Sequence, residues 1–222
     1  MITLALDAST YEGDVALLDR GRVLAEQPAA MKGRESEQLM PAVAAVLQRA
    51  GLDLGAVERV VCGAGPGSFT SLRIAGGIAK GIASGLGLPL FAAPSLALVV
   101  AGAPPRAGRY LAALDALRGE FYVALYDVDE TGCIEEVEPA RIVAAADVGS
   151  VAGEYRAKIV SPPPTAFEAG AQSRPRASGV GRIESLLARR GEVDVRSWEP
   201  SYGRLAEAQV KWESAHGRPL PR

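Results

Sequence analysis

The first part of the chain places apolar residues in short blocks separated by polar turns, a pattern that predicts strands before helices. Residues 2–6 are largely apolar, the polar segment 7–13 predicts a β-hairpin turn, and residues 14–18 return as the second strand. A third strand is expected at about 22–27, after Gly21. The chain is therefore expected to open with three consecutive strands.

Helical periodicity begins after these strands. Residues 34–50 repeat apolar side chains at the spacing of one helical face, which predicts an amphipathic helix that ends at Gly51. A strand is expected at 57–62, a second helix at 71–87, and then one more strand and helix. The order predicted for the first half is β-β-β-α-β-α-β-α. The apolar face of the first helix comprises Leu39, Val43, Val46, Leu47 and Ala50.

A glycine-rich turn joins the strand at 57–62 to the second helix. Gly63, Gly65 and Gly67 alternate along it, which suggests a phosphate-binding loop at a helix N-terminus. The known motifs fit poorly, because no lysine follows until Lys80 and Ser68 stands where a dinucleotide fingerprint has its third glycine. A tight turn that directs the helix is the alternative interpretation.

The helix at 71–87 consists largely of small residues. Alanines recur at every fourth position in one row, and glycines recur in the next row. Each glycine inside a helix costs about 1 kcal/mol relative to alanine, so these glycines indicate close approach of another backbone. One face is expected to pack in the core and another against a partner; the sequence leaves open which row is exposed. The rows are Ala75, Ala79, Ala83 and Gly77, Gly81, Gly85.

Composition narrows the classes of function. The formal net charge is −2 over 222 residues, with no run of lysine or arginine, which argues against a protein that binds nucleic acid through its own charge. Cys62 and Cys133 lack the spacing of a metal or redox motif. The uncharged stretch that begins at Gly81 is interrupted by Pro89 and Pro94, so no membrane span is expected. The first residues lack a secretory signal pattern, and a cytoplasmic location is expected.

The second half of the chain repeats the first. A shift of 108 positions places residues 5–8 on 113–116, and it aligns Glu12 with Glu120. Such a duplication predicts two similar subdomains, at 1–105 and 106–222, each with an acidic hairpin loop facing a cleft. This is the α/β architecture of the actin, Hsp70 and sugar-kinase superfamily, a duplicated ribonuclease H-like fold.

Four segments resemble the TsaB (YeaZ) family over nearly the whole chain. Residues 6–10 read LDAST, and residues 63–74 read GAGPGSFTSLRI, close to the family's GxGPGSFTGxRIG. Residues 115–122 read DALRGEFY, and residues 199–204 read EPSYGR, similar to its E-P-x-Y-x-R segment. One departure is Glu35, which stands where many members have histidine and alters the charge near the first helix.

The resemblance implies a non-catalytic subunit in the synthesis of threonylcarbamoyladenosine on tRNA. TsaB proteins bind and activate TsaD, which transfers the threonylcarbamoyl group, and the ATPase TsaE joins them. They also form homodimers through the same region, the helices at 34–50 and 71–87. No cofactor of its own is expected, ATP or ADP would enter only in the complex, and tRNA would be met only through it. The implied interface comprises Glu35, Gln38, Leu39, Ala42, Phe69, Thr70, Leu72, Arg73, Gly76, Gly77 and Lys80.

The resemblance also implies a vestigial nucleotide cleft without catalytic groups. TsaD-like enzymes hold a metal with an HxxxH pair, and Ser95 and Val99 occupy that spacing here. The one histidine of the chain is His216, so neither a metal site nor a Ser-His-Asp triad is expected. The cleft residues would be Asp7, Ser9, Thr10, Asp115, Gly119 and Glu120.

Two other functions stay open from the sequence. The first is an ATP-dependent kinase or ATPase that uses Asp7, Asp14, Asp115 and Glu120 for magnesium and phosphate. Against it, aspartates are common in hairpin turns, and the second half lacks a glycine-rich adenosine loop. The second is a protease that acts on TsaD through Ser68 and His216, and a single histidine near the end of the chain argues against it.

Overall fold

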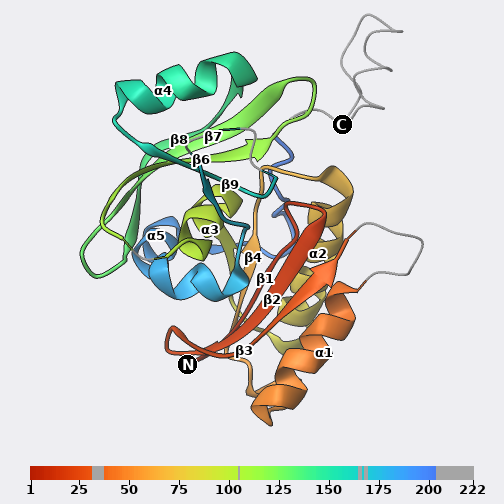
Figure 1. The fold of residues 1–222 in the computed structure, drawn as a ribbon. Coiled ribbons are helices and arrows are strands. Elements are labelled where there is room, and N and C mark those ends of the chain that lie inside the picture. Colours follow the sequence, from red (N-terminus) through yellow and green to blue (C-terminus); the bar gives the residue numbers. More distant parts are fainter. Residues whose placement is uncertain (32–37, 105, 165–166, 168–169, 204–222) are drawn as a thin grey trace, which may run out of the picture.

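The computed structural model describes residues 1–31, 38–104, 106–164, 167 and 170–203, which form two mixed sheets with helices on their faces (Figure 1). The first sheet has the strand order β11-β5-β4-β1-β2-β3, in which β1 pairs antiparallel with β2 and parallel with β4. Its strands are β1 Ile2–Asp7, β2 Glu12–Asp19, β3 Arg22–Ala30, β4 Arg59–Gly63, β5 Leu90–Ala93 and β11 Glu192–Val193.

The second sheet has the order β10-β9-β6-β7-β8, and its five strands correspond one by one to β5-β4-β1-β2-β3. The predicted duplication is therefore confirmed by topology. The hairpins differ in register, because Leu6 pairs with Val15 whereas its counterpart Leu114 pairs with Tyr122 rather than Val123. The strands are β6 Gly108–Asp115, β7 Glu120–Val128, β8 Ile134–Ala144, β9 Lys158–Ser161 and β10 Ala171–Gln172.

Helices α1 Leu39–Ala50 and α2 Phe69–Leu86 cover one face of the first sheet. Each ends at a glycine in the left-handed region, Gly51 and Gly87, as the sequence predicted for the first. The observed order of the first half is the predicted one, with a short 3-10 turn at Leu54–Ala56 added.

Helix α3 Ser95–Gly102 lies between the two sheets. Seven of its eight residues, Ser95 to Ala101, are buried, as expected for a helix that is apolar all round. Helix α4 Val148–Glu154 covers the outer face of the second sheet (Figure 1). Within the described residues, no helix is both long and apolar enough to cross a membrane.

The C-terminal part of the chain returns to the first sheet. A 3-10 segment, η3 Ala177–Arg182, contacts β1, β2 and β3, and β11 pairs with β5. Helix α5 Glu184–Arg190 follows η3, and its Glu184 pairs with Arg59 of β4. The sequence assigns all of 106–222 to the second subdomain, whereas η3 and β11 lie against the first sheet and α5 contacts both sheets, since its Arg190 pairs with Glu136 of β8.

Candidate functional site

The glycine turn after β4 is closed by neighbouring backbone. A Cβ atom at Gly63 would clash with the Asp7 carboxylate, and one at Gly67 would clash with the backbone of Ser9. Gly65 has a φ of +84° and faces the carbonyl of Ser201, which also excludes a side chain. The three glycines are therefore required because two other segments, residues 7–9 and the segment at Ser201, approach the turn closely.

Asp7 connects the end of β1 to this turn. Its Oδ1 accepts hydrogen bonds from the Ser9 amide at 2.8 Å and the Ser9 hydroxyl at 2.7 Å. Its Oδ2 accepts a hydrogen bond from the Ser95 hydroxyl at 2.5 Å. The Ser95 hydroxyl oxygen in turn accepts a hydrogen bond from the Gly65 amide at 3.0 Å. Burial raises the pKa of Asp7, and the hydrogen bonds from Ser95 and Ser9 oppose the rise. This carboxylate thus holds the turn and the start of α3.

The second acidic loop is built differently. Asp115 is exposed, and its Oδ1 accepts the amide of Leu117 at 2.7 Å within its own turn. Leu117, Arg118 and Gly119 all have positive φ values, which makes the turn tight. Among the described residues, no group of three or more histidine, cysteine or acidic side chains is placed to hold a metal ion. The predicted cleft residues thus divide between a buried set around Asp7 and an exposed set around Asp115.

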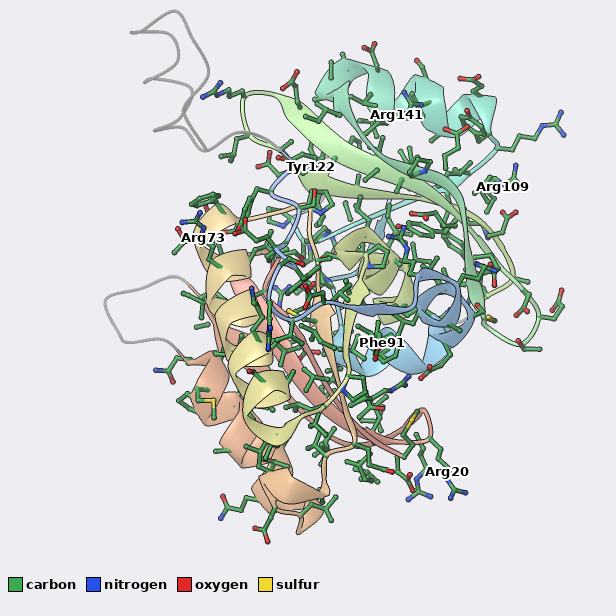
Figure 2. The ribbon with its side chains drawn as sticks, turned by 180° about the vertical axis from the view of Figure 1, so that it is seen from behind. Arg20, Arg73, Phe91, Arg109, Tyr122 and Arg141 are labelled. Atoms are coloured by element: carbon green, nitrogen blue, oxygen red, sulfur yellow. The ribbon has the colours of Figure 1, made fainter. Side chains whose placement is uncertain are left out.

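Residues 198–203, which we call the C-terminal strap, cover the glycine turn and one side of α2. The Ser201 amide donates to the Ala64 carbonyl at 2.7 Å. Lys80 Nζ donates to the Trp198 carbonyl at 2.9 Å, and the Tyr122 hydroxyl of β7 donates to the Tyr202 carbonyl at 3.2 Å. The strap therefore ties α2 to the second sheet; Figure 2 labels Arg73 at the end of α2 and Tyr122 on the second sheet.

The strap also completes an aromatic cluster at the start of α2. The rings of Phe69 and Tyr202 lie 4.6 Å apart, centroid to centroid. The guanidinium carbon of Arg73 lies 4.2 Å from the Phe69 centroid, and Arg73 Nε donates to the Tyr202 hydroxyl at 3.3 Å. Arg73 is held in place while its side chain stays exposed.

The structure determines which row of α2 is exposed. Ala75, Ala79 and Ala83 are at most 1% exposed and pack in the core of the first subdomain. The glycine row points the other way, and no heavy atom of the described residues lies within 4 Å of a Cβ built at Gly77, Gly81 or Gly85, apart from the helix's own backbone.

The residues implied as an interface separate by burial. Leu39, Ala42 and Leu72 are in the protein's own core, and Gly76 packs against Pro200 and Trp198 of the strap. A second group is at least partly exposed, and Glu35 lies outside the described residues. A contact with a partner stays a prediction for the exposed part of the set, which comprises Gln38, Phe69, Thr70, Arg73, Gly77 and Lys80.

A buried pair of carboxyl groups lies on the other face of the first sheet. Asp14 and Glu26 are diagonal neighbours on β2 and β3, and their carboxyl groups interact. Asp14 is 4% exposed; its Oδ2 accepts the Ala177 amide at 2.8 Å, and its Oδ1 has no donor among the described residues. Glu26 accepts bonds from Ser178 and Arg176.

Asp14 is the member of this pair whose surroundings favour the protonated form. Burial, followed by the hydrogen bond and the negative charge of Glu26, raises the pKa of Asp14 to about 8. Burial would also raise the pKa of Glu26, but its bonds to Asp14, Ser178 and Arg176 outweigh burial and lower it. A protonated Asp14 can donate to Glu26, which satisfies the oxygen that otherwise lacks a donor.

The sequence did not reveal the strap or this pair. The segment 199–204 was noted only as a motif of the resembled family, and its contacts depend on how the chain returns to α2. The sequence suggests Asp14 as a group for magnesium and phosphate binding, whereas no sequence pattern singles out Glu26 as its neighbour. Alternation on β3 could have placed Glu26 on the inner face, beside Asp14, if the register had been known.

Two sheets of the same strand order in one chain, with helices packed between and around them, define the class: a duplicated α/β fold of the actin, Hsp70 and sugar-kinase type. A family model described as TsaD, tRNA N6-adenosine threonylcarbamoyltransferase, matches residues 26–159.

Curated proteins of similar sequence identify the family within this fold class. The chain is 32% identical to the tRNA threonylcarbamoyladenosine biosynthesis protein TsaB of Bacillus subtilis, over 96% of this chain and 98% of that protein. It is 38% identical to TsaB of Escherichia coli, over 60% and 58% of the two chains. The chain belongs to the TsaB (YeaZ) family.

Solved structures agree with this assignment. The structure of YeaZ from Pseudomonas aeruginosa superposes with a TM-score of 0.72 at 28% identity, covering 90% of this chain and 99% of that one. A second Pseudomonas aeruginosa structure, described as an uncharacterized protein with similarity to peptidase YEAZ, gives a TM-score of 0.76 at 29% identity. It covers 91% of this chain and 99% of that chain.

The two rows of α2 should respond oppositely to substitution. Gly81→Ala should stabilise the protein by about 0.5–1 kcal/mol, because alanine is the better helix former and its methyl group meets no other atom. Ala79→Leu should destabilise it by about 1–3 kcal/mol, because the site is fully buried. Chemical denaturation of both variants measures the difference, and destabilisation by Gly81→Ala would contradict the assigned exposure.

The Asp14 proton should make stability fall as pH rises. The pKa of Asp14 is about 8 in the folded protein and 3.8 for an unperturbed aspartate, as in the unfolded chain, so the folded state holds one extra proton between these values. This part of the stability is complete below the lower value and is lost as pH rises to about 8, at up to about 1.4 kcal/mol per pH unit. Asp7 contributes in the same direction, so a variant is needed to isolate Asp14.

Asp14→Asn isolates this contribution, because its amide is always neutral and can donate to Glu26. Denaturation from pH 5 to 8 measures how the unfolding free energy depends on pH. We expect the slope of this dependence to decrease by the equivalent of nearly one bound proton. The control is Asp53→Asn, which removes an exposed aspartate. Parallel curves for the wild type and Asp14→Asn would show that Asp14 is ionised at neutral pH.

Proposed function

We propose that this protein is a non-catalytic subunit that binds TsaD and supports threonylcarbamoyladenosine formation on tRNA. The observation that carries the proposal is the exposed glycine row of α2, where Gly77, Gly81 and Gly85 meet no other atom of the described residues. Exposed glycines weaken a helix, and close packing of a partner helix would offset that loss. The curated relatives are named as threonylcarbamoyladenosine biosynthesis proteins.

We choose TsaD as the partner because the TsaD family is related in sequence to this chain. The TsaD family model matches most of the first subdomain and part of the second, so the two proteins have related folds. Related chains commonly pair through equivalent elements, and the same surface of α2 can therefore serve a homodimer. TsaE, tRNA and ATP or ADP would join through the TsaD complex, in the cytoplasm, and this chain would need no cofactor of its own.

The chemistry of the glycine turn supports a non-catalytic role. Both oxygens of Asp7 already accept hydrogen bonds, and the strap covers the turn that would otherwise receive a phosphate. The Ser68 hydroxyl is engaged in a hydrogen bond with the Ser71 hydroxyl at 3.0 Å. These contacts argue against both the ATPase and the protease interpretations.

A bulky side chain on the glycine row tests the proposal. Gly81→Leu should weaken binding to the TsaD protein of the same organism by about 100-fold or more, because leucine prevents close helix packing. Its thermal unfolding should change little, since the space around position 81 is open. Calorimetry gives the affinity, and a reconstituted reaction with TsaD, TsaE and tRNA gives the modification rate, which should fall in parallel.

The matched control is Gly149→Leu, an equally open and exposed glycine on α4, which lies over the second sheet. It should bind TsaD as the wild type does. Normal binding by Gly81→Leu, or a modification reaction that runs equally well without this chain, would refute the proposal. ATP turnover by the isolated chain, abolished by Asp7→Asn, would favour the ATPase instead.

A further inference from the structure

Arg73 is a surface arginine whose position is fixed by its own protein. Its guanidinium stacks on Phe69 at 4.2 Å and lies 5.5 Å from the Tyr202 ring centroid, and its Nε donates to the Tyr202 hydroxyl. Most exposed arginines lose side-chain entropy when they bind a partner. Here two aromatic rings have already ordered the side chain, so binding through Arg73 would carry a smaller entropic penalty.

The donor groups on the two terminal nitrogens of Arg73 indicate which kind of partner group it can bind. Within the part of the chain that the structure describes, no carboxylate forms an ion pair with Arg73, whereas several other arginines have one. A planar guanidinium whose Nε is already engaged still presents N–H groups on both terminal nitrogens. Carboxylates and phosphates both match this donor arrangement with two parallel hydrogen bonds, and a protein partner supplies the carboxylate.

Arg73 also heads the exposed row of α2. Arg73, Gly77, Gly81 and Gly85 follow one another at intervals of four residues, so they share one side of the helix. A partner helix packed along the glycines would therefore pass beside the guanidinium at one end. Arginine and aromatic residues are the types most enriched among strongly contributing interface residues.

We infer that the partner bound on the glycine row contributes an aspartate or glutamate, which Arg73 receives in a charge-assisted contact. This inference rests on the proposed function, in which that partner is TsaD. Tyr202 is a positioning residue in this arrangement, because it holds the guanidinium through its ring and hydroxyl. Lys80 contributes indirectly, because its Nζ donates to the Trp198 carbonyl and so anchors the strap.

The strap makes this surface a composite of two distant parts of the chain. Phe69 and Arg73 belong to α2, whereas Tyr202 arrives from the C-terminal strap and is held by Tyr122 of the second sheet. Figure 2 shows Arg73 at the end of α2 nearest to Tyr122. The acidic contact thus depends on the strap being seated on the glycine turn, which gives the second subdomain a part in partner binding.

The experiment measures binding to TsaD for Arg73→Glu, Arg73→Lys and Gly81→Leu at low and high salt. Arg73→Glu should weaken binding about 100-fold, and Arg73→Lys about 5- to 10-fold, since lysine keeps the charge but loses the fork and the stacking. The wild type should lose affinity with salt more steeply than Arg73→Glu does. The control is Arg141→Glu, the same charge change at an exposed position on β8, which should have no effect.

Tyr202 provides the test of positioning. Tyr202→Ala should weaken binding about 10-fold and reduce its salt dependence, while Tyr202→Phe, which keeps the ring, should restore most of the affinity. An Asp→Lys or Glu→Lys substitution in the contact helix of TsaD should bind Arg73→Glu better than wild-type TsaD does. Thermal unfolding of each variant is measured alongside, and Arg73→Gln replaces Arg73→Glu if the latter unfolds.

The outcomes separate this inference from the proposed function. If Gly81→Leu weakens binding but Arg73→Glu does not, the surface is correct and the acidic contact is wrong. If neither weakens binding, the surface itself is wrong. If Arg73→Glu weakens self-association of this chain but not TsaD binding, the carboxylate belongs to a second copy, and the inference about TsaD is overturned.

Discussion

The buried carboxylate of Asp7 is the contact on which the arrangement of the functional region depends. It receives hydrogen bonds from Ser9 and Ser95, and Ser95 also receives the amide of Gly65. A carboxyl group taken out of water is tolerated only when its oxygens are satisfied, so the three segments have little freedom to separate. Because α2 begins directly after the glycine turn, this contact also sets the direction of α2 and of its exposed face.

The two halves of the duplicated fold have diverged around this point. In the first half, the aspartate that ends β1 is buried and accepts hydrogen bonds from Ser9 and Ser95. In the second half, Asp115 at the end of β6 is exposed and accepts a hydrogen bond within its own hairpin. A cleft that grips phosphates and magnesium needs oxygen ligands and amides that are free to face the ligand. The strap and Ser9 occupy the space beside the glycine turn instead. The same strand topology thus carries a closed turn in this protein, with the strap and Ser9 against the glycines.

Sequence patterns predicted what is local in this structure. The order of strands and helices in the first half, the duplication and the small-residue rows of α2 all follow from periodicity and repetition along the chain. The phase of α2 could not be predicted, because alanine and glycine rows are equally small and only packing distinguishes them. The family resemblance placed Leu39, Ala42 and Leu72 at an interface because it implies which helices meet a partner but not which of their faces, and the side chains of these three residues fill the core. The strap, the Arg73 cluster and the pairing of Asp14 with Glu26 join residues that are distant in sequence, and no local pattern encodes such contacts.

The glycines of the turn and those of α2 differ in a way that separates folding from function. Gly63, Gly65 and Gly67 are explained by the fold, because any side chain there would clash with Asp7, Ser9 or Ser201. Gly77, Gly81 and Gly85 have no such explanation among the described residues, yet together they weaken α2 by about 3 kcal/mol relative to alanine. That is a large part of the roughly 5–15 kcal/mol by which a domain is stable. A helix that is weakened on its outer face, beside an arginine fixed by two rings, gains most from a second helix that packs closely against it. The proposed contact with a partner helix would supply the physical reason for this sequence of α2.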